Sequence, residues 1–175
     1  MKAYFYITIL VLVSACVPQN KPTTPTHIQV DSVYTIADLR SYGDYYHSGH
    51  QVYALDLLSE GLEYDSAGYI IGSGCNLYLS DIFTHKDSTA GLPAGIYRMD
   101  STAKEGCFLR GMEFESNITG TYLLVIKENK IQKILLFKSG TMTLNYTHGD
   151  TLLNFDLYTA DSTHYRATYK GLSQQ

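Results

Sequence analysis

Thr141-Met142-Thr143-Leu144-Asn145-Tyr146-Thr147-His148-Gly149 is the stretch of sequence that decides the fold class. Its first seven residues alternate strictly, so Met142, Leu144 and Tyr146 share one face of a strand and polar residues occupy the other. His148-Gly149 then stands where a two-residue hairpin turn needs positive φ. The stretch therefore predicts a half-buried β-strand that ends in a hairpin.

The alternation continues beyond this hairpin. Leu153, Phe155 and Leu157 occupy every second position of one predicted strand, Tyr165, Ala167 and Tyr169 do so in the next, and Asp161-Ser162 marks the turn between them. Earlier segments with the same character are 52–58, 76–83, 96–99, 122–126 and 131–137. Glu128-Asn129-Lys130 favours a tight hairpin, and Ser80-Asp81 interrupts the alternation, which suggests a bulge. Only residues 35–42 favour a helix, and it is short.

Strands at this spacing, with turn residues between them, are typical of an all-β domain. We expect a single antiparallel β-sandwich of about 8–10 strands over residues 33–175, with barrel-like closure as the alternative. The 175 residues fit one domain, and 45% hydrophobic with 17% charged residues excludes a wholly disordered chain. A net charge of −4 gives no electrostatic case for binding nucleic acid.

The N-terminal segment has the features of an export signal. Lys2 precedes an apolar run that is too short to span a bilayer, and Val13-Ser14-Ala15-Cys16 resembles a bacterial lipobox. We expect residues 1–15 to be a lipoprotein signal peptide and Cys16 to carry the lipid, with acyl chains such as palmitate giving lasting membrane anchorage. Residues 16–32 then form a flexible, Pro-containing tether. Val17 resembles the second residue of lipoproteins sorted to the outer membrane.

Lipidation of Cys16 leaves Cys75 and Cys107 as the two remaining cysteines. An oxidising compartment would allow them to form a disulfide. The sequence leaves two readings open, this bridge and a pair of half-buried thiols, because it does not show whether their Cα atoms come within about 7 Å.

Several short motifs resemble those of a group of small, uncharacterised Bacteroidota outer-membrane lipoproteins. The motifs are Tyr42-Gly43-Asp44-Tyr45-Tyr46, Leu55-Asp56-Leu57, Gly61-Leu62, Gly72-Ser73-Gly74, Leu77-Tyr78-Leu79, Pro93-Ala94-Gly95-Ile96-Tyr97 and Tyr169-Lys170-Gly171-Leu172. The resemblance covers most of residues 34–172. It implies an antiparallel β-sandwich on a lipid anchor, and it implies no activity.

Asp followed by Ser or Thr and then a small, aliphatic or Thr residue occurs six times. The hydroxyl residues of these triplets are Ser32, Ser66, Ser88, Ser101, Thr151 and Ser162. The pattern resembles the O-glycosylation sequon of exported Bacteroidota proteins, and nearly all copies lie in predicted turns, where a glycan would be solvated. The alternative is that Asp-Ser and Asp-Thr simply form good turns.

Tyr42-Gly43-Asp44-Tyr45-Tyr46 is the candidate ligand-binding motif, through Tyr42, Asp44, Tyr45 and Tyr46. Aromatic faces stack on the apolar faces of sugars, and a carboxylate accepts hydrogen bonds from sugar hydroxyls. The competing interpretation is a Tyr-rich strand edge, since Tyr has high β propensity.

Other polar clusters are weaker candidates for a functional site. His47 and His50 beside Asp44 could be imagined as metal ligands, but a solvated loop explains them better. Three strand carboxylates could be imagined as a glycosidase pair, although each is expected to face outward into solvent: Asp56, Asp81 and Asp156. No nucleophile, phosphate-loop or dinucleotide motif is present. We therefore expect no catalytic residues, no metal and no cofactor.

Together these features predict a cell-envelope lipoprotein that is anchored in the outer membrane by lipid. The sequence leaves both the periplasmic and the cell-surface face of that membrane as places for the domain. Its domain is expected to be a non-enzymatic binding or interaction module for a glycan or an envelope protein. The alternatives are a carboxylate-dependent hydrolase and a passive structural component.

Overall fold

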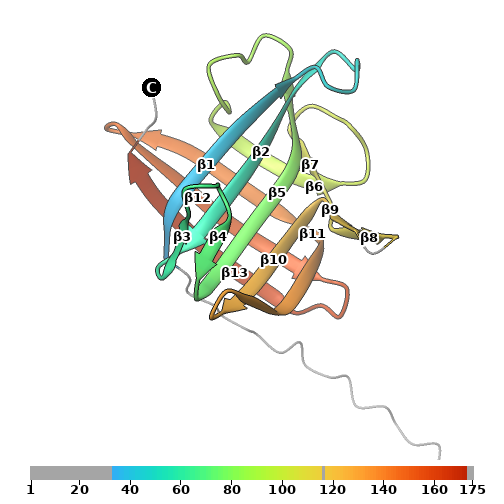
Figure 1. The fold of residues 1–175 in the computed structure, drawn as a ribbon. Helices are drawn as coiled ribbons and strands as arrows, with labels where there is room; N and C mark the ends of the chain where they lie inside the picture. The colour runs from blue at the N-terminus through green and yellow to red at the C-terminus, as the bar shows by residue number, and fades with distance from the viewer. Residues whose placement is uncertain (1–32, 116, 173–175) are drawn as a thin grey trace, which may run out of the picture.

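The structure, a computed structural model, describes residues 33–115 and 117–172 (Figure 1). The predicted signal peptide, the lipidation site Cys16, the tether and the candidate glycosylation residue Ser32 lie outside the described residues. Within the described part the chain forms strands and turns and no helix, so it contains no helix that could cross a membrane.

Nine of the strands form one large sheet: β1 (Val33–Gly43), β2 (His50–Ser59), β5 (Gly74–His85), β6 (Gly95–Asp100), β7 (Cys107–Leu109), β10 (Thr121–Lys127), β11 (Lys130–Thr147), β12 (Asp150–Thr159) and β13 (His164–Leu172). Two small sheets complete the fold: β3 (Leu62–Tyr64) with β4 (Ile70–Gly72), and β8 (Met112–Phe114) with β9 (Asn117–Thr119).

The large sheet folds over into two layers. Its order is β10-β11-β12-β13-β1-β2-β5-β7-β6, with additional pairings β10–β5 and β11–β6. In Figure 1 β1, β2, β5 and β10 form the layer toward the viewer, and β11, β12 and β13 cross behind it. The β10–β11 pairing joins the layers along one side, and the β1–β13 pairing joins them along the other. The predicted all-β, sandwich-like class is confirmed.

The sheet is mixed rather than purely antiparallel. Strands β1 and β13 pair in parallel, through Val33 with Thr168 and Tyr34 with Tyr169, and β6 also runs parallel to β7. All the other neighbouring strands of the large sheet pair antiparallel in the described part of the chain. Alternation within a strand does not reveal its partner, so the sequence pattern could not predict these two parallel pairs.

The core lies between the layers, where the alternating apolar positions meet. Met142, Leu144, Leu153, Phe155, Leu157, Tyr165, Ala167 and Tyr169 are all buried, as the alternation predicts. Tyr146 occupies the same face of its strand but is not buried, because 48% of it is exposed. Its hydroxyl donates a hydrogen bond to the carbonyl of Leu92. A second, smaller apolar cluster sits outside the front layer, beneath the β3–β4 hairpin, and contains Leu58, Leu62 and Ile126.

The predicted tight turns are present. His148 and Gly149 have φ of 52° and 87°, and Glu128 and Asn129 have φ of 51° and 63°, the positive values that a two-residue hairpin with the right twist requires. The turn at Asp161 is closed by the Ser162 amide, which donates to the carbonyl of Thr159.

Two local predictions fail. The expected helix over residues 35–42 is strand β1, which pairs with β2 along most of its length. The segment has a short apolar pattern of helical period, but a helix this short is marginal on its own. The β-branched residues at its start favour a strand, and pairing with β2 supplies ladder hydrogen bonds along it. The segments 131–137 and 141–147 are one strand, β11, which continues through a register shift between Phe137 and Ser139.

Candidate functional site

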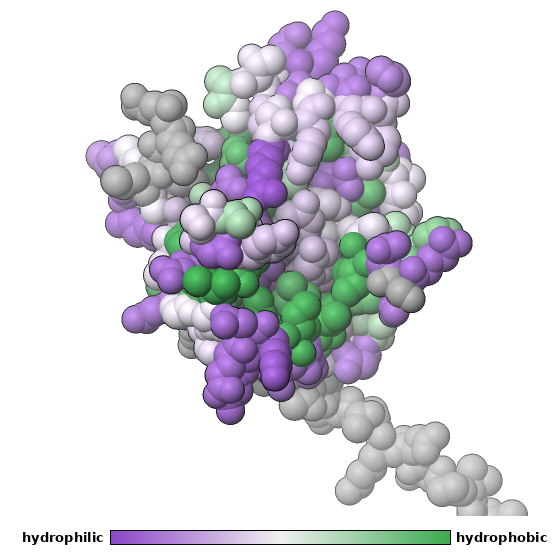
Figure 2. Space-filling model, in the orientation of Figure 1, coloured by the Kyte–Doolittle hydropathy of each residue, from purple (hydrophilic) through white to green (hydrophobic). Residues whose placement is uncertain are grey.

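A groove lined by tyrosines crosses the outer face of the front layer. Its walls come from β1, the following loop, β2, β5, β9 and β10, and its volume is about 380 Å³. We call it the tyrosine groove, and the residues that matter below are Tyr42, Tyr45, Tyr78, Ser80, Asp81 and Tyr122. In Figure 2 the centre of this face is pale, between hydrophilic purple above and a green apolar patch below.

Two of these tyrosines form the floor of the groove. Tyr78 on β5 is the register partner of Tyr122 on β10, and their ring centroids lie 5.2 Å apart with the planes 32° from parallel. Both point outward because each neighbours a buried leucine in its strand, Leu77 or Leu123. Two half-buried rings held side by side by backbone pairing make a rigid aromatic surface.

Tyr42 and Tyr45 extend this surface from the end of β1. Both are exposed, Tyr45 by 65%, and both line the groove together with Tyr78. Burial, reinforced by the neighbouring hydroxyls of Tyr42 and Tyr122, raises the pKa of Tyr78 above that of a free tyrosine. The Tyr78 phenol therefore stays protonated at neutral pH and can donate a hydrogen bond.

The predicted bulge at Ser80-Asp81 is confirmed, and it places a carboxyl group in the groove. Asp81 has φ of 52°, and the β2–β5 register shifts between Tyr53 and Leu55. The Asp81 carboxylate accepts hydrogen bonds from Tyr46 Oη at 2.8 Å and Ser80 Oγ at 2.7 Å. A bulge can redirect a side chain in this way, and here it turns an acidic group toward the aromatic floor.

The other two residues of the candidate motif hold the loop and do not line the groove. The Asp44 carboxylate accepts hydrogen bonds from the backbone N–H groups of Ser48 (2.8 Å) and Gly49 (3.0 Å). The Tyr46 ring lies 5.9 Å from the buried Phe83 ring, centroid to centroid. Burial and the hydrogen bond to Asp81 raise the pKa of Tyr46 to about 12.

The structure thus brings Tyr42 and Tyr45 of the predicted motif together with Tyr78, Tyr122 and Asp81, which the motif does not contain. Tyr78 and Tyr122 could have been noticed as aromatic residues on the polar phase of alternating strands. Their meeting depends on the β5–β10 pairing, which joins segments more than forty positions apart and leaves no local pattern.

Asp56 corrects the expectation that the strand carboxylates are solvated. It is only 7% exposed, and its carboxylate accepts hydrogen bonds from Tyr64 Oη at 2.9 Å and from Nδ2 of Asn76. Burial raises the Asp56 pKa, although these two hydrogen bonds and Arg40 act in the opposite direction. The cause of the burial is the β3–β4 hairpin, which brings Tyr64 over a position that strand alternation alone places on the surface.

The remaining charged candidates are separate from the groove lining. Asp156 is half-exposed and lies 2.6 Å from Nε2 of His164. His47 is exposed in the loop after β1, and His50 begins β2 opposite His85. Among the described residues, no three His, Cys, Asp or Glu side chains are grouped as a metal ion requires.

The described candidate glycosylation residues differ in their exposure: three are exposed and two are half-buried. Ser66, Ser101 and Ser162 are exposed in turns, and the preceding Asp65, Asp100 and Asp161 side chains accept backbone N–H groups of those same turns. Ser88 is half-buried in a turn. Thr151 departs from the expected pattern, because it is half-buried within β12. Turn formation by the Asp residues is therefore visible, and glycosylation stays a prediction.

Cys75 and Cys107 do not form a disulfide with each other. Cys107 is the register partner of Phe83, eight positions along β5 from Cys75. At roughly 3.3 Å per residue, that separation is about 25 Å, far beyond the Cα distance that a disulfide spans. The bridge that the sequence left open is thus wrong for this fold, and both cysteines are half-buried.

Comparison with known proteins gives no further guide to this site. The chain matches no family model, no curated protein and no solved structure.

Proposed function

We propose that this protein is a lipid-anchored component of the cell envelope whose β-sandwich domain binds carbohydrate without chemical turnover, through the tyrosine groove. One observation carries the proposal: the paired rings of Tyr78 and Tyr122, extended by Tyr42 and Tyr45, share a groove with the carboxylate of Asp81.

The composition of the groove suits a sugar. The rings of Tyr78 and Tyr122 offer flat apolar surface for the C–H face of a pyranose. Phenol hydroxyls, the Ser80 hydroxyl and the Asp81 carboxylate supply donors and acceptors for the sugar hydroxyls at its rim. A volume of about 380 Å³ lies within the roughly 300–1,000 Å³ range of small-molecule sites.

The same lining disfavours the hydrolase alternative. Glycoside hydrolysis in its usual form needs two carboxyl groups, one on each side of the scissile bond. Asp81 is the one carboxyl-bearing residue among those lining the groove. Asp56, the nearby buried carboxyl, is engaged with Tyr64 and Asn76.

The sequence of the N-terminal segment is what supports the envelope location in this proposal. A lipidated Cys16 would hold the domain at the outer membrane, and the 16–32 segment would let it reach a ligand beyond the lipid surface. Cys16→Ala should release the protein from the membrane fraction of the native host. Continued membrane association of that variant would contradict the anchor.

The binding test uses an array of neutral oligosaccharides, followed by calorimetric titration of the best binder into the protein. Tyr45→Ala and Tyr122→Leu should each weaken binding about tenfold or more, since removing one stacked ring commonly costs this much in affinity. Tyr69→Ala is the matched control, because Tyr69 is 72% exposed and outside the groove lining.

Each alternative predicts a different result. A passive structural component shows no saturable ligand on the array. A hydrolase releases new reducing ends, and Asp81→Asn stops their release. If the groove binds a partner protein, that protein is recovered in pull-downs from envelope extracts by the wild type and not by Tyr45→Ala, and no sugar binds. Any of these outcomes overturns the carbohydrate proposal.

A further inference from the structure

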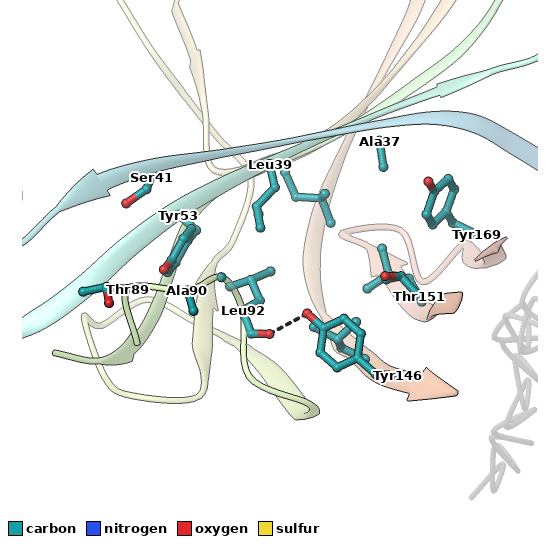
Figure 3. A pocket seen from close by; sticks show the side chains of 14 residues that line it. Ala37, Leu39, Ser41, Tyr53, Thr89, Ala90, Leu92, Tyr146, Thr151 and Tyr169 are labelled. Carbon is teal, nitrogen blue, oxygen red and sulfur yellow. Dashed lines mark hydrogen bonds between the residues drawn. The ribbon is translucent and has the colours of Figure 1, made fainter. Parts of the chain in front are cut away.

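A second hollow lies between the two layers and is separate from the tyrosine groove. It opens where β1 diverges from β13 after their two paired positions, and its volume is about 320 Å³. In Figure 3 β1 passes along one side with Ala37, Leu39 and Ser41, and Leu92 and Tyr146 lie on the opposite side. We call this space the interlayer pocket.

The lining of the interlayer pocket carries no ionisable acid or base of the Asp, Glu, Lys, Arg or His type. Its apolar side chains include leucines of the main core, among them Leu55, Leu144 and Leu153. A ligand with a formal charge would lose its hydration there and gain no opposite charge. An uncharged, mainly apolar molecule meets no such penalty.

Two tyrosine hydroxyls of the lining are already occupied. Tyr53 donates to the carbonyl of Ser88, and Tyr146 donates to the carbonyl of Leu92 at 2.7 Å, the dashed line in Figure 3. Both bonds attach the segment around Leu92 to the strands, so this wall of the pocket is held in place before any ligand arrives.

Tyr169 differs from these two. Its side chain is only 8% exposed and lines the pocket, yet its hydroxyl has no hydrogen-bond partner among the described residues. Among the described residues, Nδ1 of His50 is the one fully enclosed side-chain polar atom without a partner, so the Tyr169 hydroxyl keeps some accessible surface, and its residue lines the pocket. Buried hydroxyls usually find a partner, and one that faces a hollow is suited to bind a ligand atom.

The neighbouring sequence fits this placement. A Cβ on Gly171 would collide with the Tyr169 hydroxyl, so glycine at position 171 leaves the ring room to lie along the strand. Burial also raises the pKa of Tyr169, which keeps the hydroxyl protonated and able to donate.

We propose that the interlayer pocket binds a small, uncharged, mainly apolar molecule whose oxygen atom accepts a hydrogen bond from the Tyr169 hydroxyl. A medium-chain aliphatic alcohol has this chemistry. The proposal is independent of carbohydrate binding, because no residue lines both the interlayer pocket and the tyrosine groove.

The test titrates the full folded domain with three probes of equal chain length: 1-octanol, octanoate and octylamine, at neutral pH. Displacement of the neutral dye Nile red reports occupancy. We expect 1-octanol to displace the dye saturably and the two charged probes to bind at least tenfold more weakly. Equal binding of the charged probes, or no saturable binding of 1-octanol, overturns the proposal.

Two variants locate the site. Tyr169→Phe removes only the hydroxyl and should weaken 1-octanol binding about 2- to 12-fold, the range for one net hydrogen bond. Ala37→Phe fills the pocket from β1 and should abolish binding, with thermal unfolding checking that the domain remains folded. Tyr45→Ala, in the tyrosine groove, should leave 1-octanol binding unchanged. Binding that is unaffected by both pocket variants places the probe elsewhere and overturns the assignment.

Discussion

The hydroxyl groups of Tyr34 and Tyr165 hydrogen-bond to each other inside the core, although 131 positions separate them in the sequence. Both residues are 1% exposed. Tyr34 stands at the start of β1, where only two register pairs attach this strand to β13. The bond therefore reinforces the seam at which the first and last strands of the described domain join the two layers.

Removing one member of this pair should destabilise the domain. Tyr165→Phe leaves the Tyr34 hydroxyl buried without its partner, and the expected cost is about 1–3 kcal/mol in the free energy of unfolding. The double variant Tyr34→Phe/Tyr165→Phe should recover part of this loss, because no Tyr34 hydroxyl then remains to be satisfied. Urea unfolding of the two single variants and the double variant measures the coupling. Strict additivity would show that the two hydroxyls do not interact.

Local pattern was sufficient for two of the strands that build the core. In the middle of β12 and β13, at 153–157 and 165–169, every second residue is apolar and buried, so the alternation identified both the strands and their inner faces. The hairpin turns were predictable for a similar reason, since His148-Gly149 and Glu128-Asn129 satisfy a local backbone requirement.

Contacts between distant segments explain what the sequence did not predict. The helix expected over residues 35–42 is a strand because β2 pairs with it. Asp56 is buried because the β3–β4 hairpin covers it, through Tyr64. The candidate site was half predicted, because Tyr42 and Tyr45 lie in one motif, whereas Tyr78 and Tyr122 reach it only through strand pairing.

The burial of Asp56 should give a measurable pH dependence. Its folded-state pKa lies above 3.8, the ordinary value for an aspartate, so the unfolded chain releases this proton at lower pH than the folded chain does. The stability that Asp56 contributes should therefore fall as pH rises from about 3.8 through the raised pKa, and then level off. Urea unfolding of the wild type and Asp56→Asn between pH 3 and 7 should show the variant gaining relative stability over this window.

Asp161→Asn is the matched control for this experiment. Hydrogen bonds from Thr159 and Thr163 lower the Asp161 pKa, so its contribution is present above the unfolded-state value and is lost as pH falls. The two variants should therefore differ in the sign of their pH slopes. The same sign for both would contradict the assignment of Asp56 as a carboxyl disfavoured by burial.

Asp44 should affect carbohydrate binding through the loop and not by contact with the sugar. Its carboxylate holds the Ser48 and Gly49 amides, and it is absent from the groove lining. Asp44→Ala should speed hydrogen exchange at these two amides and weaken binding severalfold, because Tyr45 is then less well positioned. In a Tyr45→Ala background, Asp44→Ala should have little further effect on affinity. An equal loss of affinity in both backgrounds would indicate a direct contact between Asp44 and the sugar.

The close approach of Gly171 to Tyr169 gives the last prediction. Gly171→Ala forces the Tyr169 ring from its place, because the new methyl group would overlap the hydroxyl and the adjacent ring atoms. We expect a loss of about 1–3 kcal/mol in the free energy of unfolding, as for other overpacked sites. In a Tyr169→Leu background the same substitution should cost much less, since leucine does not extend over position 171. Thermal and urea unfolding of the four proteins in this cycle measure the difference. Equal costs in both backgrounds would mean that the strain comes from the backbone of β13 and not from the Tyr169 ring.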